Sequence, residues 1–396
     1  MFKDKTIVIG VGGGIAAYKT ASLVSKLSKT EADVHVIMTE NAKNFINPIT
    51  FETLTGNKCM VDTFDRNFRF NVAHVAIAKK ADLFMVAPAT ANLIAKFACG
   101  LADDMLTTTF LASKCKKMVV PAMNTAMYEN PVTGDNLKKL ESYGIEVIEP
   151  SEGYLACGDT GKGKMPEPEQ LYLNIEKELA KEKDLQGKKV LITAGATKES
   201  IDPVRFITNH SSGKMGFALA KEAMLRGAEV TVVKGATTAE IPSFVEIIPV
   251  SSAEDMAKEV LSRADKCDII IKAAAVADYT PAQVATEKLK KKDGEMSIPL
   301  KRTVDILRKL GENRRDGQFI CGFSMETENM VENSKKKLEA KKCDMIVANN
   351  LKETGSGFGT DTNGVTFIDS EGIEPQDMMT KEEVAAKIFD KIVDRI

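Results

Sequence analysis

Short apolar runs alternate with amphipathic segments along the whole sequence, and this alternation constrains the fold more than any other feature. Runs such as Leu83–Ala87 are apolar throughout, which is typical of strands covered on both faces in a parallel sheet. The first half therefore predicts a doubly wound α/β domain. Its predicted strands are Thr6–Val11, Val34–Met38, Leu83–Ala87, Met118–Pro121 and Glu146–Ile148. Its predicted helices are Ile15–Lys29, Leu93–Phe97, Asp104–Lys114 and Asn136–Tyr143.

The same alternation restarts at Val190, after a charged helical segment, Glu169–Lys183, and a polar stretch. We place a domain boundary near Gln186, giving domains 1–186 and 187–396, each Rossmann-like with ligands at the carboxyl ends of its strands. The second domain's predicted strands are Val190–Thr193, Glu229–Val233, Val245–Ile248, Ile269–Ala273, Phe319–Phe323, Met345–Ala348 and an antiparallel edge strand, Val365–Ile368. Its predicted helices are Met215–Arg226, Ala253–Ala264, Val304–Leu310, Val331–Lys341 and Lys381–Arg395.

Composition excludes several classes of protein. The 54 Lys and Arg against 56 Asp and Glu leave a net charge of −2, whereas a general nucleic-acid binder has a strong basic excess. The seven cysteines have no CxxC spacing, which predicts reduced thiols in a cytoplasmic protein, and three histidines without a cluster argue against zinc. The chain enters a strand at Thr6 without a signal peptide, and no apolar run approaches the roughly 20 residues that span a membrane.

Glycine-rich turns follow the first predicted strand of each domain. Gly10–Ile15 fails the dinucleotide fingerprint because Ile15 stands at the third glycine position, so it is either a tight turn without a ligand or a mononucleotide phosphate site. In the second domain, Thr193–Thr197 and Asn209–Gly216 leave the same choice, since Ser212 is either a helix N-cap or a phosphate ligand. Spacing alone indicates two nucleotide- or phosphate-binding domains.

The segment Gly153–Met165 holds four glycines and Cys157 and has neither helical nor strand periodicity. It predicts a functional loop, because long loops inside compact domains are usually functional or disordered. Its Gly158-x4-Gly163-Lys164 spacing approaches a phosphate-binding P-loop. We reject that interpretation because Met165 replaces the required Ser or Thr, and prolines follow where a helix should begin.

Specific motifs of the first half resemble the flavin-dependent cysteine decarboxylases. They occur in the family's order: Gly12–Lys19 (GGGIAAYK), Ala87–Asn92 (APATAN), Pro121–Tyr128 (PAMNTAMY) and Ala156–Gly158 (ACG). Gly12 departs from the relatives, which often have serine there. The resemblance implies an FMN cofactor, with contacts from Gly12, Gly13, Gly14, Thr39, Pro88, Ala89, Thr90 and Asn92.

The same resemblance implies a reaction and three catalytic roles. FMN oxidises the thiol of a cysteine-derived substrate to a thioaldehyde, carbon dioxide leaves, and the resulting enethiolate is reduced back. His74 is then the base or proton relay, and Asn124 holds the departing carboxylate. The loop Gly153–Met165 is a flap over the flavin site, from which Cys157 donates a proton to the enethiolate. Without the family, each has an ordinary structural alternative: a surface or core histidine, a turn asparagine and an inert buried cysteine.

The second half resembles phosphopantothenoylcysteine synthetases, through Asp202–Gly216 (DPVRFITNHSSGKMG), Ala273–Tyr279 (AAAVADY) and Glu287–Lys291 (EKLKK). In this order the two halves resemble bacterial bifunctional enzymes of coenzyme A synthesis, over essentially the whole chain. The resemblance implies that 4′-phosphopantothenate reacts with CTP to form an acyl-cytidylate, from which the amine of cysteine displaces CMP. The choice of CTP over ATP rests on this resemblance.

Roles in the ligase reaction follow from the same resemblance. Asn209 handles the acyl-cytidylate, Arg205 binds substrate, Lys288 is the catalytic cation of a mobile strap, and Asp278, expected at a strand end, binds Mg²⁺. The basic run around Lys288 has a solvated loop as its ordinary alternative. Implied nucleotide contacts are Ala273, Ala274, Ala275, Asp278, Lys288, Val304 (commonly proline in relatives), Asp305, Ile306, Leu307, Phe323, Lys337 and Lys341.

Two rival interpretations belong to other classes. Decarboxylase-like subunits that regulate phosphatases need not keep His74, Asn124 and Cys157 together, and have no reason to carry a synthetase domain. A nicotinamide-dependent reductase lacks support because GxGxxG and Tyr-x-x-x-Lys are absent. The family resemblance further implies a homo-oligomer with trimeric flavin domains and dimeric ligase domains, a dodecamer being one such assembly, and neither nucleic acid nor a membrane as partner.

Overall fold

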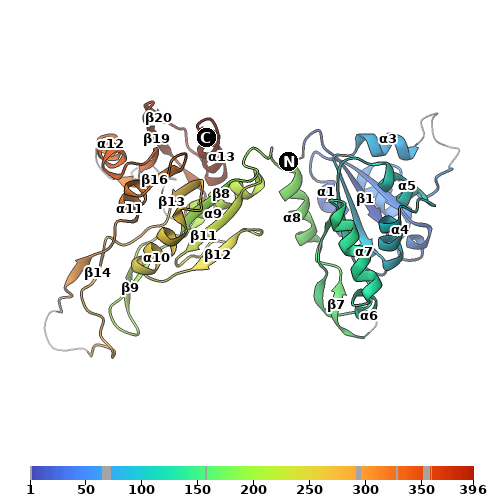
Figure 1. Cartoon of the computed structure of the whole chain (residues 1–396), viewed down its shortest axis with the longest axis horizontal. Helices are drawn as coiled ribbons and strands as arrows, with labels where there is room; N and C mark the ends of the chain where they lie inside the picture. Colours follow the sequence, from blue (N-terminus) through green and yellow to red (C-terminus); the bar gives the residue numbers. More distant parts are fainter. Residues whose placement is uncertain are drawn as a thin grey trace. The chain divides into compact units, whose positions relative to one another are not determined.

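The computed structural model describes residues 2–64, 73–156, 158–290, 296–326, 329–350, 357 and 359–396. The chain divides into two compact units, Met1–Ala180 and Lys181–Ile396, a few residues before the boundary that we predicted (Figure 1). Cys157 and residues 291–295 of the basic segment lie outside the described residues. Among the described helices, none is both long and apolar enough to cross a membrane.

Unit 1 is built on a five-stranded sheet in the order β2-β1-β3-β4-β5. All its strand pairs are parallel, as predicted for a doubly wound domain. The strands are β1 (Thr6–Val11), β2 (Asp33–Met38), β3 (Leu83–Ala89), β4 (Lys116–Pro121) and β5 (Glu146–Val147). The helices are α1 (Ala17–Leu27), η1 (Glu40–Asn44), α2 (Pro48–Thr55), α3 (Ala73–Lys80), α4 (Ala91–Cys99), α5 (Met105–Ala112), α6 (Thr125–Tyr128), α7 (Pro131–Ser142) and α8 (Pro168–Leu179).

Helices cover both faces of this sheet, which explains its uninterrupted apolar strands. Every residue of β1 is buried, and its side chains alternate between two cores. Ile7 and Ile9 pack with Leu23 of α1, whereas Val8 packs on the other face with Leu93 of α4 and Leu106 of α5. The alternation follows because successive side chains of a strand point to opposite faces.

The glycine-rich segment around Cys157 corrects our prediction of a loop. It forms an antiparallel hairpin of β6 (Ser151–Tyr154) and β7 (Thr160–Lys164). The backbone at Gly163 and Lys164 is therefore an extended strand. This excludes a P-loop more directly than the missing Ser or Thr at position 165 did. No helix begins directly after Lys164, in agreement with the proline argument. The next helix, α8, begins at Pro168, and proline is well tolerated in a first turn.

Unit 2 has an eight-stranded sheet in the order β12-β11-β8-β13-β16-β17-β19-β20. Its first six strands are parallel and the last two pair antiparallel. Val365–Asp369 (β19) is antiparallel as predicted, but β20 covers its outer side, so our edge assignment was wrong. The strands of this sheet are β8 (Lys189–Ala194), β11 (Glu229–Lys234), β12 (Glu246–Pro249), β13 (Ile269–Lys272), β16 (Phe319–Glu326), β17 (Met345–Asn350), β19 and β20 (Ile373–Pro375).

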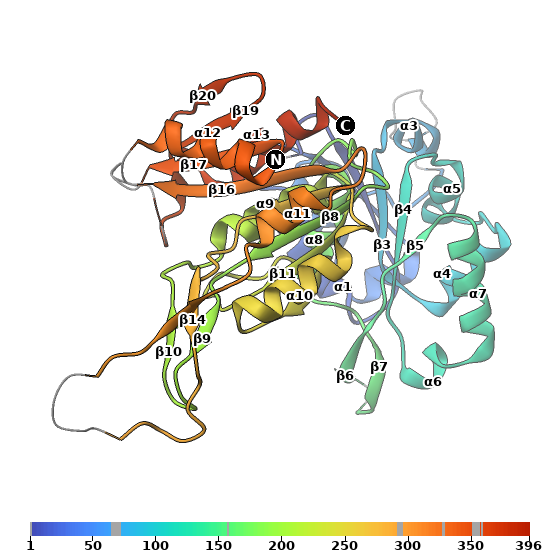
Figure 2. The same ribbon diagram turned by 60° about the vertical axis from the view of Figure 1, so that its left-hand side comes forward.

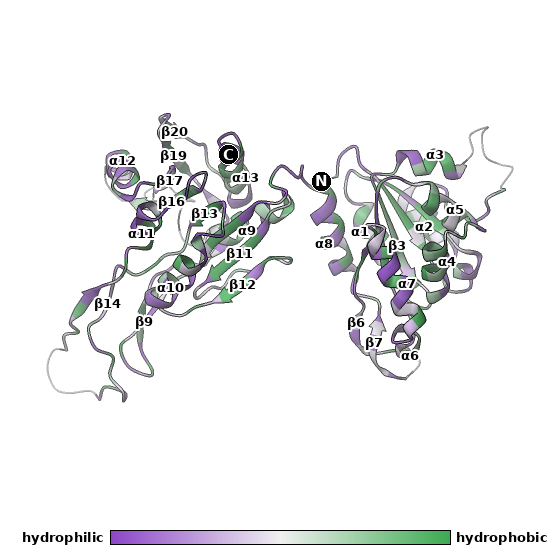
Figure 3. Ribbon diagram, in the orientation of Figure 1, coloured by the Kyte–Doolittle hydropathy of each residue, from purple (hydrophilic) through white to green (hydrophobic). Residues whose placement is uncertain are grey.

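The helices of unit 2 cover both faces of the sheet. Figure 3 shows hydrophobic residues gathered on the central strands and hydrophilic residues over the outer helix α12. The helices are α9 (Lys214–Leu225), α10 (Ala253–Ala264), α11 (Ile306–Glu312), α12 (Met330–Lys341) and α13 (Lys381–Val393).

Two short antiparallel pairs project together from unit 2 as an arm (Figures 1 and 2). They are β9 (Lys198–Ser200) with β10 (Phe206–Thr208), and β14 (Tyr279–Pro281) with β15 (Leu300–Arg302). A further small pair, β18 (Thr362–Asn363) with β21 (Met379–Thr380), precedes α13. The arm bears Arg205 and the described part of the basic segment, for which we predicted roles in the ligase reaction.

Candidate functional site

The strand order of unit 1 reverses between β1 and β3, and two turns meet there. Such switch points are where open α/β sheets bind ligands. The N–H of Gly12 donates to the Pro88 carbonyl at 3.0 Å. A Cβ at position 12 would lie 2.5 Å from that oxygen, so this approach requires glycine. Gly12 thus holds two predicted flavin-binding turns together, and the serine of relatives does not fit this arrangement.

The turn before α1 offers donors for an anion. Within the part of the chain that the structure describes, the N–H groups of Gly13, Ile15 and Ala16 have no acceptor. They stand at the amino end of the 11-residue helix α1, where the helix dipole favours negative charge. These amides fit the phosphate of a mononucleotide such as FMN.

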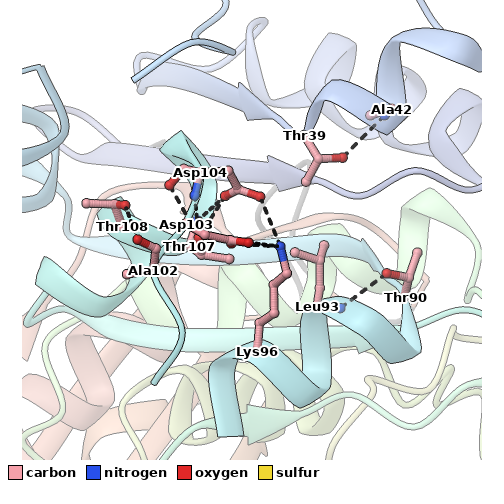
Figure 4. Close-up of polar contacts among 10 residues, drawn as sticks. All are labelled: Thr39, Ala42, Thr90, Leu93, Lys96, Ala102, Asp103, Asp104, Thr107 and Thr108. Atoms are coloured by element: carbon pink, nitrogen blue, oxygen red, sulfur yellow. Dashed lines mark hydrogen bonds and ion pairs between the residues drawn. The ribbon is translucent and has the colours of Figure 1, made fainter. Parts of the chain in front are cut away.

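Thr39 and Thr90 follow β2 and β3, the strands on either side of β1, and each caps the helix that comes next (Figure 4). The Thr39 hydroxyl accepts from the Ala42 amide at 3.2 Å, and the Thr90 hydroxyl from the Leu93 amide at 3.3 Å. Each hydroxyl acts as an acceptor there, so its proton remains for a ligand oxygen. Both residues are among the flavin contacts that the sequence resemblance implies.

An ion pair connects α4 to the start of α5 behind these turns (Figure 4). The Lys96 ammonium lies 2.7 Å from an Asp103 oxygen and 3.8 Å from Asp104. Asp104 also caps α5 by accepting from the Thr107 amide at 2.8 Å. These contacts fix α5 beside α4, and α4 is the helix that Thr90 begins.

The β6–β7 hairpin docks on the predicted carboxylate-binding motif. Asn124 caps α6 through its amide oxygen and donates from Nδ2 to Asp159 at 2.6 Å. The Met123 amide donates to the Gly163 carbonyl at 3.1 Å, and a Cβ at Gly163 would lie 2.3 Å from the Met123 oxygen. Glycine is therefore needed in β7 to let the hairpin approach the Asn124 turn.

Lys19, in the first glycine motif, anchors the end of this hairpin. The side chain is almost fully buried, and its ammonium donates to the Met165 carbonyl and to Glu167, each at 2.8 Å. The motif that begins α1 thus supports both the phosphate-facing turn and the hairpin. The sequence resemblance had marked Lys19 without giving it a role.

The three predicted catalytic residues of unit 1 are not all brought together. Cys157 lies outside the described residues, but its flanks are closed by a Leu155 amide to Asp159 carbonyl bond of 2.8 Å. The hairpin therefore brings Asp159, beside this closing bond, against Asn124. His74 lies in α3, at the opposite end of unit 1 from α6 and the hairpin (Figures 1 and 2).

In unit 2 a pocket of about 270 Å³ opens at the carboxyl ends of the central strands. Six of the predicted nucleotide-binding residues line it: Ala273, Ala274, Ala275, Asp278, Phe323 and Lys337. Its further lining includes the start of α9, with Ser211, Ser212, Gly213, Lys214, Met215 and Gly216. The remainder is Lys272, Val276, Ser324, Met325, Asn349, Gly357, Asn363 and Lys381.

The predicted contacts from 304 to 307 and Lys341 lie outside this lining. Val304 is exposed, and Asp305 caps α11 and pairs with Lys341. Ile306 and Leu307 are buried in the core beneath α11, so a ligand can meet them only through their backbone. Asp278 lies directly before β14 rather than at the end of β13, which corrects our placement.

Arg205 and the basic segment meet on the arm. The Arg205 guanidinium holds the pKa of buried Asp202 well below its usual range, although burial opposes ionisation. Arg205 also donates to the Leu289 carbonyl at 2.9 Å, and Asp202 accepts from the Leu289 amide at 3.1 Å. Lys288 is thereby tethered to the Arg205 turn, outside the pocket lining. Asn209 donates to the Ala275 carbonyl at 3.1 Å, beside the pocket.

Sequence analysis did not single out three lysines that line the pocket. Lys214 donates to the Gly359 carbonyl and Asp361, whereas Lys381 is buried and donates to the Gly357 and Thr360 carbonyls. Lys272 ends β13, and burial and nearby Lys337 lower the pKa of its ammonium to about 8. The sequence signal for Lys272 was a single charged residue directly after the apolar run 269–271.

The described residues include no group of three or more His, Cys, Asp and Glu side chains that could hold a metal ion alone. Asp278 lines the pocket as a single carboxylate. That donor set fits Mg²⁺ bound mainly by substrate phosphates, because Mg²⁺ commonly uses one or two carboxylates beside them.

Known proteins match this chain throughout. Residues 1–180 match the Flavoprotein family, and 185–396 match the DNA/pantothenate metabolism flavoprotein C-terminal domain. The coenzyme A biosynthesis bifunctional protein CoaBC of Bacillus subtilis is 48% identical over 99% of this chain and 97% of its own length. The CoaBC protein of Haemophilus influenzae is 42% identical over 99% of this chain and 98% of its own length.

A crystal structure of the C-terminal domain of a CoaBC protein is 44% identical, covering 54% of this chain and 97% of its own, with a TM-score of 0.46. The full-length sequence matches carry the assignment. The chain belongs to the CoaBC family of bifunctional coenzyme A biosynthesis proteins.

Proposed function

We propose that unit 2 joins 4′-phosphopantothenate to cysteine with CTP, and that unit 1 decarboxylates the product to 4′-phosphopantetheine. The observation that carries the proposal is the fit of each site to its chemistry. Unit 1 presents unfilled amides at a switch point beside a docked hairpin. Unit 2 presents a pocket with lysines and one carboxylate at the carboxyl ends of its strands.

In the ligase reaction, a carboxylate oxygen of 4′-phosphopantothenate attacks the α-phosphorus of CTP, forming acyl-cytidylate and releasing pyrophosphate. The cysteine amine then attacks the acyl carbon, and CMP leaves. Negative charge grows on phosphate and carbonyl oxygens in both steps, so fixed cations and amide donors stabilise the transition states. Lys337 lines the pocket, Asn209 lies beside it, and both would supply such donors, while Asp278 would hold Mg²⁺ against the phosphates.

Lys288 acts from the arm. The Asp202–Arg205 pair holds the Leu289 backbone, so Lys288 is presented at a fixed turn rather than on a free chain. It lies outside the pocket lining of its own unit. We propose that it reaches the nucleotide of a second copy, consistent with a ligase dimer.

FMN bound at the β1/β3 turns would supply the oxidation and reduction of the substrate sulfur-bearing carbon. Its phosphate would be held by the amides of Gly13, Ile15 and Ala16 and by the hydroxyls of Thr39 and Thr90. Asn124 orients the substrate carboxylate with its Nδ2 donor, replacing the bond to Asp159. Cys157 delivers the last proton, since an ordinary thiol is mainly protonated near neutral pH.

His74 must come from another copy of the chain, because α3 lies at the far end of unit 1 from Asn124 (Figures 1 and 2). We therefore propose that oligomerisation of unit 1 completes the decarboxylase site, in a trimer. The corresponding test mixes two inactive variants, His74→Ala and Asn124→Ala. Partial activity of the mixture supports a shared site, and a mixture as inactive as its components contradicts it.

The decarboxylase proposal is tested with purified protein and supplied 4′-phosphopantothenoylcysteine. We expect a yellow protein with a flavin spectrum that releases carbon dioxide. Cys157→Ser should still release carbon dioxide but accumulate the oxidised enethiol, which a mass spectrum separates from 4′-phosphopantetheine. A colourless protein that FMN does not reconstitute would refute the proposal. Asn209→Asp should block ligation alone and serves as the matched control.

A further inference from the structure

Lys272 is the last residue of β13 and points into the pocket of unit 2. Its side chain lies on the same face as Ile270, because side chains two residues apart in a strand share a face. Ile270 packs in the core beneath α10 and α11, and Lys272 continues that face into the pocket. The strand therefore places an ammonium group where its apolar core ends.

Within the described residues, Lys272 forms neither a hydrogen bond nor an ion pair, although it is half-buried. The other pocket lysines differ. Lys214 and Lys381 donate to carbonyls or Asp361, and Lys337 donates to the Phe323 carbonyl at 3.0 Å.

The charges that face Lys272 make its isolation unfavourable. Lys337 and Lys341 approach it from α12, Asp305 from the start of α11, and Asp278 from the segment before β14. Asp305 is already paired with Lys341. Lys337 and Asp278 remain and their charges cancel, so the ammonium of Lys272 itself leaves the group with a net positive charge. A partly buried ammonium without an ion pair loses hydration without compensation. An anion in the pocket removes that cost.

We infer that Lys272 is a substrate-binding residue of the ligase site whose ammonium donates to a phosphoryl oxygen of the nucleoside triphosphate. The inference rests on the proposed function and adds a phosphate ligand that the family motifs did not indicate. A triphosphate offers several charged acceptors within the reach of three N–H donors. The half-buried position strengthens this contact compared with one at the surface.

The inference predicts opposite effects on stability and on binding. Lys272→Met keeps the length of the side chain and removes the charge, so the ligand-free protein should melt at or above the wild-type temperature. The same variant should bind Mg-CTP about tenfold to a hundredfold more weakly, the usual scale of one charge-assisted hydrogen bond. Lys272→Arg should keep most of the affinity. A purely structural lysine would instead destabilise the protein when it is removed.

The experiment is calorimetric titration of the full-length protein with Mg-CTP, inorganic tripolyphosphate and cytidine. Lys336→Met is the matched control, because Lys336 is an α12 lysine outside the pocket lining that pairs with Glu332 on the surface. We expect Lys272→Met to weaken CTP and tripolyphosphate and leave cytidine unchanged, and Lys336→Met to change none of them. The melting curve of each variant, compared with that of the wild type, verifies that unit 2 is folded.

The outcomes of this titration distinguish failure of the inference from failure of the proposed function. Equal tripolyphosphate affinity for Lys272→Met and wild type overturns the inference whatever happens with CTP. A loss for cytidine equal to that for CTP also overturns it, because the contact would then be to the nucleoside. Wild type that binds tripolyphosphate but not CTP refutes the proposed ligase function and leaves the anion site. Wild type that binds neither overturns both.

Discussion

One added methyl group can test whether decarboxylation requires the β6–β7 hairpin to lie against α6 and the Asn124 turn. Gly161 has ordinary backbone angles, but a Cβ there would lie 2.8 Å from both Cγ2 and Oγ1 of Thr125 in α6. Gly161→Ala therefore overpacks the contact without backbone strain. Overpacking costs about 1–3 kcal/mol. The docking equilibrium shifts by about 5- to 150-fold toward the undocked hairpin, since 1.4 kcal/mol is tenfold.

Thr125→Ala should rescue this variant. It removes both clashing atoms and leaves the Thr125 Cβ at 3.4 Å, an ordinary contact distance. The Thr125 hydroxyl is buried without a hydrogen-bond partner among the described residues, so Thr125→Ala alone should cost little. Compensation is expected because the two residues touch, and contacting pairs are non-additive.

The assay follows carbon dioxide from supplied 4′-phosphopantothenoylcysteine at saturating substrate. Gly161→Ala should lose most of this activity, the double variant should regain it, and ligation by unit 2 should stay unchanged in both. Full decarboxylation by Gly161→Ala would refute the claim that docking is needed. Failure of Thr125→Ala to restore activity would place the defect elsewhere than at this contact.

Three further predictions concern the chain outside that contact. Lys19→Met should lower decarboxylation and make the hairpin more sensitive to limited proteolysis, because about 1.5–3 kcal/mol of charge-assisted bonding at Met165 is lost; unchanged proteolysis would contradict this. At pH 8, iodoacetamide should modify exposed Cys99 but not Cys59, whose pKa burial raises to about 12; peptide mass mapping that finds both labelled alike would be contrary evidence. Burial opposes ionisation of Asp33, but hydrogen bonds from neighbours including Lys80 outweigh it and lower the pKa of Asp33 from 3.8 to about 2. Ionised Asp33 therefore stabilises the folded protein above about pH 4, and this stabilisation is lost as the pH falls toward 2. Acid denaturation should show that loss in wild type and not in Asp33→Asn, by an amount of about 1 kcal/mol after allowing for solvent screening.

The sheets were predictable because their strands are buried on both faces. Ile7, Val8 and Ile9 have core on each side, so the apolar run marks the strand whatever packs on it. The turns at the carboxyl ends of the strands lie where such folds bind ligands. Family membership was equally accessible, because whole motifs rather than single residues carried it.

The hairpin was not predictable from periodicity. Its strands are mostly exposed and contain Gly153, Gly161 and Gly163, so neither apolar alternation nor β propensity marks them. What forms the hairpin is pairing with itself and close approach to the Asn124 turn, which glycines permit. That approach is a tertiary contact between distant residues, and a local pattern does not contain it.

Lys272 was missed for a related reason. In the sequence it closes an apolar strand and looks like the first solvated residue after it. In the structure, Lys272 lines a pocket together with Phe323 of β16 and Lys337 of α12, so the charge is not on the open surface. Lys381 shows the same effect at the start of α13, where it is buried although charged. Only the packing of neighbouring helices distinguishes such lysines from surface ones.

The most direct test of the account supplies the protein with 4′-phosphopantothenate, cysteine, CTP and Mg²⁺, and follows pyrophosphate and carbon dioxide together. We expect equal amounts of the two, with 4′-phosphopantetheine as product and no carbon dioxide when CTP is omitted. Carbon dioxide released from cysteine without nucleotide, or pyrophosphate that is never followed by carbon dioxide, would contradict it.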